Sequence, residues 1–157
     1  MRRRWPLLLV ALATGFVQSA HAQAFDESWK RISDREIGIS VDYPSGIFAT
    51  YSGPTDRHPG KRFRSADGAE FAYYAFDNKA DESPSSYLGR TLIVEPRKLI
   101  YKRITSRFFV ISSVRNGRIF YSRCNFGPRV KCIYLDYAAA DKRAWDRAVT
   151  RVSHSLR

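Results

Sequence analysis

A pair of cysteines within one aromatic-rich stretch, YSRCNFGPRVKCIYLDY (residues 121–137), constrains this chain more than any other feature. The residues on either side of Gly-Pro-Arg at 127–129 are rich in aromatic and β-branched side chains, which predicts two strands joined by a turn. In a hairpin centred on this turn, Cys124 and Cys132 lie directly opposite each other on one face. The Cα–Cα separation of two residues directly opposite each other on paired strands is one that a disulfide can bridge.

The compartment is indicated by the first residues, MRRRWPLLLVALATGFVQSAHAQAF. Three arginines precede an apolar run over residues 7–17, and Ala20-His21-Ala22 offers a small-x-small cleavage site. This pattern predicts a signal peptide over residues 1–22 that is cleaved after Ala22. The run is shorter than the roughly 20 residues that span a bilayer, and no later stretch is long and apolar enough. We therefore expect a periplasmic or secreted mature protein, residues 23–157.

An oxidising compartment favours a disulfide between the two cysteines. The alternatives are a redox pair and a zinc site, but a C-x-x-C motif is absent and zinc would need two more ligands nearby. We predict a disulfide between Cys124 and Cys132. Closing a loop of about 9 residues contributes roughly 2.5 kcal/mol by the chain-entropy estimate.

The remaining pattern predicts a single α+β domain over residues 23–157, with an antiparallel sheet and helices packed on it. Strands are expected over residues 37–43, 62–65, 69–77, 98–104, 108–114, 118–126 and 130–137. The last four of them are expected to form a meander. Residues 25–32 are predicted as a short amphipathic turn and residues 52–61 as a loop.

Two helices are predicted. The first covers about residues 84–94, where Ser83 is a good N-cap and Pro84 suits the first helical position. The second covers about residues 139–156 and is amphipathic. Its apolar stripe is Trp145, Ala148, Val149, Val152 and Leu156, and its opposite stripe is Arg143, Arg147 and Arg151.

The charge of the chain is basic and unevenly distributed. Residues 23–157 hold 24 Lys and Arg against 15 Asp and Glu, a net charge of +9. Residues 23–96 carry a net −3, whereas residues 97–157 carry +12. Such a split can indicate a half that binds a polyanion. Alternatively, the two halves interleave in one fold and their charges pair in space.

Basic residues interleave with aromatic residues across the predicted meander and continue on the last helix. The candidate residues for binding an anion or a partner are Arg118, Arg123, Arg129, Lys131, Arg143, Arg147 and Arg151. They would suit an anionic envelope component or an acidic protein. The alternative is that the aromatic residues form the core and the arginines keep the domain soluble. Nucleic acid is disfavoured because no nucleic-acid motif is present.

The motifs of common enzymes are missing. His58 and His154 are isolated, no G-x-S-x-G or glycine-rich phosphate loop occurs, and the acidic stretch at residues 77–83 lacks the spacing of a calcium loop. No catalytic residue, metal site or cofactor is predicted. A small secreted enzyme, such as a hydrolase with scattered catalytic residues, remains the alternative to a non-enzymatic protein, and the sequence does not indicate the oligomeric state.

Five segments in succession resemble the PsbP-like superfamily: GISVDYPSGIF, FRSADGAEFAYYAF, SPSSYLGRTL, RFFVISSVRNGRIFYSRC and the last helix. The chain is also similar to a group of secreted proteins of rhizobial-type alphaproteobacteria, which share Y-x-R-C-N-F, a second cysteine and a tryptophan-bearing helix. The resemblance covers about residues 38–157. It implies an accessory or binding protein rather than an enzyme, and it supplies no catalytic motif.

Overall fold

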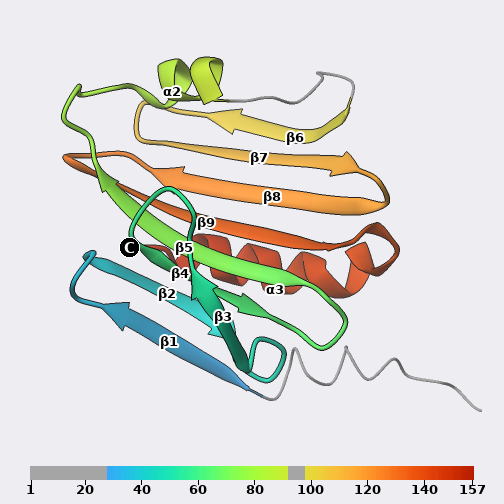
Figure 1. Ribbon diagram of the computed structural model, residues 1–157. Coiled ribbons are helices and arrows are strands. Elements are labelled where there is room, and N and C mark those ends of the chain that lie inside the picture. The colour runs from blue at the N-terminus through green and yellow to red at the C-terminus, as the bar shows by residue number, and fades with distance from the viewer. Residues whose placement is uncertain (1–27, 92–97) are drawn as a thin grey trace, which may run out of the picture.

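The computed structural model describes residues 28–91 and 98–157, which form two antiparallel sheets and two helices (Figure 1). The strands are β1 (Trp29–Asp34), β2 (Ile39–Pro44), β3 (Thr50–Pro54), β4 (Gly60–Arg64), β5 (Glu70–Asp77), β6 (Leu99–Ile104), β7 (Phe108–Arg115), β8 (Arg118–Asn125) and β9 (Arg129–Ala138). The helices are α2 (Pro84–Thr91) and α3 (Lys142–Ser155), with a 3-10 turn, η2 (Ala139–Asp141), before α3. The predicted signal peptide, residues 1–22, lies outside the described residues.

Seven strands form the large sheet in the order β3-β4-β5-β9-β8-β7-β6, and every neighbouring pair is antiparallel. Strands β6 to β9 follow one another as the predicted meander. Strand β9 then pairs with β5, which places the cysteine hairpin next to the middle of the sheet. Strands β1 and β2 form a separate hairpin. The predicted α+β fold class, an antiparallel sheet with helices, is confirmed.

The main core lies between α3 and one face of the large sheet. Figure 1 shows α3 behind strands β5 and β9. The predicted apolar stripe of the helix is buried in this core, with Trp145 and Val152 at 1% and 0% exposed. The helix also holds β2, because the backbones of Ser40 and Arg157 exchange two hydrogen bonds of 3.0 and 2.8 Å. The last helix therefore binds both sheets together.

The opposite face of the large sheet carries a second apolar cluster beneath α2. Leu88 of this helix packs over Phe109, Val130 and the two cysteines. Cys124 and Cys132 are partners in the register of β8 and β9 and form a disulfide, and both are 0% exposed. The structure confirms the predicted disulfide, and α2 covers it.

The prediction of an amphipathic turn near the N-terminus was wrong for residues 29–32. Trp29 and Ile32 belong to β1, in which Ile32 pairs with Val41 of β2. The spacing of Trp29 and Ile32 is compatible with one helical turn. The backbone N–H and C=O groups of this segment instead form their hydrogen bonds with β2. Residues 25–27 lie outside the described residues.

The predicted loop over residues 52–61 was too long. Strand β3 ends at Pro54 and β4 begins at Gly60, and the two strands pair across a bulge between Tyr51 and Gly53. The segment reads as a loop because it contains glycine and proline. Both residues are tolerated here because β3 is an edge strand and the bulge absorbs the irregular backbone.

The helices begin close to their predicted starts. The hydroxyl of Ser83 accepts a hydrogen bond of 3.2 Å from the N–H of Ser86, which is the expected N-cap of α2. The predicted end of this helix, residues 92–94, lies outside the described residues. In the part of the chain that the structure describes, no helix is long and apolar enough to cross a membrane.

Candidate functional site

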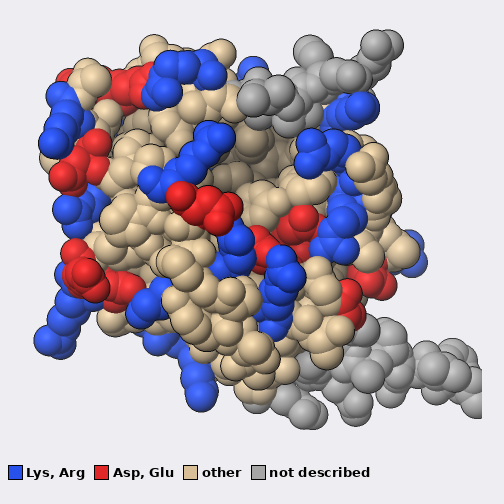
Figure 2. Space-filling view, viewed as in Figure 1, with Lys and Arg blue, Asp and Glu red and all other residues tan. Residues whose placement is uncertain are grey.

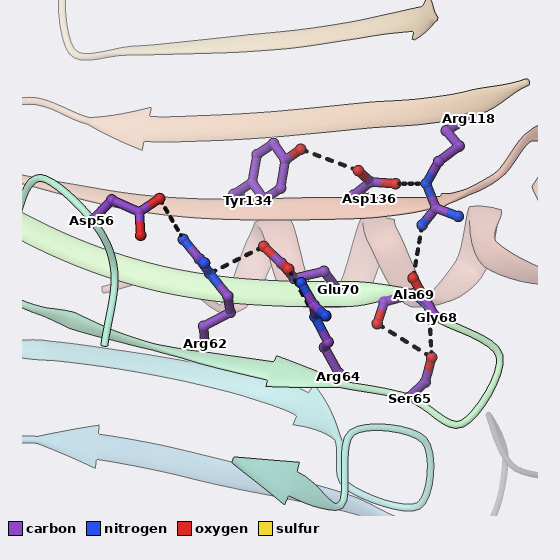
Figure 3. A network of polar contacts seen from close by, with 10 residues as sticks. All are labelled: Asp56, Arg62, Arg64, Ser65, Gly68, Ala69, Glu70, Arg118, Tyr134 and Asp136. Carbon is purple, nitrogen blue, oxygen red and sulfur yellow. Dashed lines mark hydrogen bonds and ion pairs between the residues drawn. The ribbon is translucent and has the colours of Figure 1, made fainter. Parts of the chain in front are cut away.

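The basic residues singled out from the sequence lie in several places. Arg118 lies on the same face of the sheet as the disulfide, whereas Arg123 lies on the face covered by α3. Arg118 contacts Asp136 and donates a 2.9 Å hydrogen bond to the carbonyl of Gly68 (Figure 3). The set therefore does not form one continuous patch.

Two more of these arginines pair with acids from the N-terminal half of the chain. Arg129 lies 2.9 Å from a carboxylate oxygen of Asp77. Arg151 lies 3.9 Å from Asp42, and its guanidinium carbon is 4.2 Å from the ring centre of Trp29. For these residues the two halves of the chain interleave, and their charges are partly neutralised.

Besides Arg123, three of the predicted residues have no acidic partner within 4 Å among the residues that the structure describes: Lys131, Arg143 and Arg147. Arg143 and Arg147 are exposed on α3, and Lys131 is half-buried on β9. As isolated exposed cations, the two helix arginines contribute a general positive field rather than a shaped site.

Arg123 has a different environment, because it is half-buried and contacts only neutral groups. Its Nε donates to Asn125 Oδ1 at 2.9 Å, and its Nη1 lies 3.5 Å from the hydroxyl of Ser153 on α3. The guanidinium carbon lies 4.6 Å from the ring centre of Phe108, a cation–π contact. Arg103 contacts the same ring at 5.5 Å.

We define the arginine cluster as Arg103, Arg123 and Arg157. Burial lowers the pKa of Arg123, and the nearby charges of Arg157 and Arg103 lower it further, against an opposing effect of Tyr121. Within the described ranges, no Asp or Glu side chain lies within 4 Å of any of the three guanidinium groups, and Arg157 donates to the carbonyls of His154 and Leu156. The cluster is therefore a concentration of positive charge that the described protein groups leave without an ion pair, and an anion would relieve this repulsion.

Part of this cluster could have been predicted from the strand pattern. Arg103 of β6 is opposite Val110 of β7, and Val110 is opposite Arg123 of β8, so the two arginines lie on the same face of the sheet on either side of β7. Arg103 is one of the basic residues that interleave with aromatic residues across the meander, and the alignment of β6, β7 and β8 is what places it on the same face as Arg123. Arg157 follows α3, and its approach depends on how that helix docks, which no local pattern indicates.

A pocket opens on the other face of the large sheet, beneath α2. It has a volume of about 900 Å³, and Figure 2 shows this face hollowed between groups of positive and negative side chains. The residues that line this α2 pocket are Thr55, Asp56, Arg57, His58, Arg62, Glu70, Ala72, Tyr74, Phe76, Asp77, Asn78, Lys79, Ala80, Glu82, Tyr87, Arg90, Thr91 and Tyr134.

Ion pairs organise the polar wall of the α2 pocket. Arg62 lies between two acids: its Nη2 is 2.9 Å from Asp56, and its Nε is 3.2 Å from Glu70 in an orientation that makes no hydrogen bond (Figure 3). Arg90 of α2 donates through two nitrogens to the carboxylate of Glu82, at 2.7 and 3.2 Å. These pairs place acidic and basic groups side by side along the wall.

Aromatic rings form the apolar wall of the pocket. His58 stacks on Phe76 with ring centres 4.3 Å apart, and Phe76 stacks on Tyr87 at 5.5 Å. The loop that carries His58 can approach β5 because it leads into Gly60. A Cβ at Gly60 would lie 2.1 Å from the carbonyl oxygen of Tyr73.

Among the described residues that line the pocket, His58 is the single histidine, and several acids pair with arginines. Burial lowers the pKa of His58, and the charge of Arg57 lowers it further, so the ring is neutral at neutral pH. In the described parts of the chain, no three His, Cys, Asp or Glu residues lie close enough together to hold a metal ion. Asp77 and Glu82, from the acidic stretch of residues 77–83, each pair with an arginine instead.

Comparison with known proteins relates the chain to one fold. The solution structure of cyanobacterial PsbP (CyanoP) from Synechocystis sp. PCC 6803 superposes with a TM-score of 0.61. The match has 15% sequence identity and covers 92% of this chain and 96% of that one. No family model matches the sequence, and no curated protein matches it either. The chain therefore has a PsbP-like fold.

Proposed function

We propose that this protein is a non-enzymatic binding or accessory protein outside the cytoplasm, and that its arginine cluster recognises an anionic component of the cell envelope. The observation that carries the proposal is Arg123, a half-buried guanidinium without an acidic partner within 4 Å among the described residues. The PsbP-like fold is compatible with an accessory role.

The proposed location is the periplasm or the exterior of the cell. It rests on the signal-peptide pattern of residues 1–22, with cleavage after Ala22, and on the resemblance to secreted proteins of rhizobial-type alphaproteobacteria. The buried disulfide between Cys124 and Cys132 fits an oxidising compartment. Detection of a processed N-terminus at Gln23 in an exported sample would test this part of the proposal.

The chemistry of the arginine cluster favours phosphate or carboxylate groups. A guanidinium presents a planar set of N–H donors that matches two oxygens of either group. Arg123 uses one N–H group to bond Asn125, and a second nitrogen lies 3.5 Å from the Ser153 hydroxyl, a long distance for a hydrogen bond. Its remaining N–H groups can bond to a ligand. Because this side chain is half-buried, its attraction for an anion is screened less than that of an exposed lysine.

Sedimentation of the mature protein with vesicles tests the proposal. We expect binding to phosphatidylglycerol-containing vesicles, weak binding to phosphatidylcholine vesicles, and release as salt is raised. The double variant Arg103→Gln/Arg123→Gln should lose most of this binding. The matched control is Arg143→Gln/Arg147→Gln, which removes the same charge from α3 outside the cluster.

Equal losses in the two double variants would show that only net charge matters and would refute a site at Arg123. Absence of binding at low salt would remove anionic lipid as the partner. If an acidic protein binds in place of lipid, the same variants would be tested for binding to that protein. Circular dichroism and thermal melting of each variant would show that the fold is retained.

A further inference from the structure

We propose that the α2 pocket binds a neutral, hydroxyl-rich ring ligand, namely a short saccharide. Three features of the pocket carry this inference: its size, the balance of charge on its wall, and the aromatic rings beside that wall. The pocket and the arginine cluster lie on opposite faces of the large sheet. The inference therefore goes beyond the proposed function and does not depend on it.

The position of the pocket favours a built site over a surface irregularity. Its wall combines residues from the β3–β4 loop, strands β4, β5 and β9, the loop before α2, and α2 itself. Its volume of about 900 Å³ lies within the range of ligand sites, about 300–1,000 Å³. A saccharide of a few rings fits a hollow of this size.

The charge of the wall is balanced, although the chain as a whole is strongly basic. Four basic residues line the pocket, and four acidic residues line it as well: Arg57, Arg62, Lys79 and Arg90 against Asp56, Glu70, Asp77 and Glu82. A ligand with a net charge would be attracted by one set and repelled by the other. This balance favours a ligand that is polar but neutral.

The ion pairs of the wall also present donors and acceptors side by side. Arg62 and Arg90 have five N–H groups each, and their carboxylate partners have several lone pairs, so paired groups can still bond to a ligand. A hydroxyl group both donates and accepts, and it can bond to such a pair without breaking it. A wholly apolar ligand would instead strip water from these charges at a cost of several kcal/mol.

Two tyrosine hydroxyls add further polar groups. Tyr74 and Tyr87 line the pocket, and neither hydroxyl has a hydrogen-bond partner among the described residues. Burial raises the pKa of both side chains, so both hydroxyls stay protonated and can donate. Their rings stack with those of His58 and Phe76, and the resulting aromatic cluster forms an apolar part of the wall beside which the C–H groups of a sugar ring can pack.

The test is a calorimetric and NMR titration of the mature protein with neutral saccharide probes. These are mono- to trisaccharides of glucose, galactose and N-acetylglucosamine, with glucuronic acid and glucosamine as charged analogues. We expect at least one neutral probe to bind more tightly than the charged analogues. Amide signals of residues 55–58 and 77–91 should shift, while those of the arginine cluster should not.

Two variants locate the binding. Tyr74→Phe removes one hydroxyl from the pocket and should weaken the best probe about three- to tenfold, the range of one hydrogen bond. Asp56→Asn should weaken it to a similar degree. The matched control, Tyr51→Phe, removes a hydroxyl from a side chain on β3 that is outside the pocket and 55% exposed, and it should change nothing.

Three results would overturn the inference: no binding of any neutral probe at millimolar concentration, tighter binding of a charged analogue, or an affinity that both pocket variants leave unchanged. The Arg103→Gln/Arg123→Gln variant separates this inference from the proposed function. That variant should lose vesicle binding and keep saccharide binding. Failure of either activity alone therefore refutes only the corresponding proposal.

Discussion

At the scale of single residues, the disulfide is where sequence and structure agree most closely. The hairpin turn at residues 127–129 sets the register, and this register places Cys124 opposite Cys132 with their Cα atoms 4.1 Å apart. The two cysteines are only 8 positions apart in the sequence, so the chemistry of the turn between them was sufficient to predict their pairing. The helix that covers them is more distant in sequence, and its packing there could not be predicted.

We predict that Cys124→Ser lowers the free energy of unfolding by about 2–3 kcal/mol, because the unfolded chain is no longer constrained by the crosslink. Chemical denaturation of the wild-type protein and the variant measures this difference. A second comparison uses wild-type protein that was unfolded and refolded in reductant, so that its disulfide is reduced. Equal stability with and without the bond would contradict the prediction.

At the scale of elements, long periodic segments were predicted well and irregular edge segments were not. The apolar stripe of α3 and the alternation of β2 are strong periodic signals, and the structure contains both elements. Strand β3 has glycine, proline and exposed polar side chains, and only its pairing with β4 makes it a strand. Pairing between strands is a tertiary contact, which local pattern does not encode.

We predict that Trp145→Ala destabilises the protein by about 3–5 kcal/mol, because it leaves a large cavity between α3 and the sheet. The Trp145 ring is 1% exposed and stacks on Tyr137 with ring centres 5.0 Å apart. Arg147→Ala on the exposed side of the same helix is the control and should stay within about 0.5 kcal/mol of wild type. Urea denaturation followed by circular dichroism measures both. Similar losses in the two variants would argue against α3 as the main source of core packing.

At the scale of the whole molecule, one carboxylate links the two sheets. Asp34 of β1 accepts a 2.9 Å hydrogen bond from the hydroxyl of Tyr73 on β5, and Lys61 of β4 lies 3.4 Å from it. Burial acts to raise the Asp34 pKa. The bond from Tyr73, a backbone bond from Ile37 and the charge of Lys61 outweigh burial, and the pKa lies below its ordinary value of 3.8.

A lowered pKa in the folded state gives stability that is present above pH about 4 and is lost as the pH falls through the folded pKa. We predict that Tyr73→Phe costs about 1.5–3 kcal/mol at neutral pH, the range for a hydrogen bond to a charged group. The difference from wild type should narrow as the pH falls below about 4. Thermal melts across this range, with Asp34→Asn as the control, measure it. Parallel pH profiles for wild type and Tyr73→Phe would contradict the role of this bond.

Both candidate sites are assembled from segments that are distant in the sequence, and for this reason the sequence alone revealed little of them. The α2 pocket collects residues from six separate segments between Thr55 and Tyr134, and none of these segments has a recognisable motif of its own. The arginine cluster joins β6, β8 and the residue that follows Leu156. Alignment of β6, β7 and β8 could have placed Arg103 and Arg123 on the same face of the sheet. The position of Arg157 depends on the docking of α3.

The attachment of α3 to β2 has a kinetic consequence. The hydroxyl of Ser155 accepts a hydrogen bond from the N–H of Asp42 across 113 positions of the chain, and Arg157 pairs with Ser40 over a similar span. The main core therefore closes only when segments near opposite ends of the described chain meet. Folds dominated by such distant contacts form over milliseconds to seconds rather than microseconds. The cysteine hairpin, by contrast, joins residues only 8 positions apart, and its disulfide is fully buried in the folded protein.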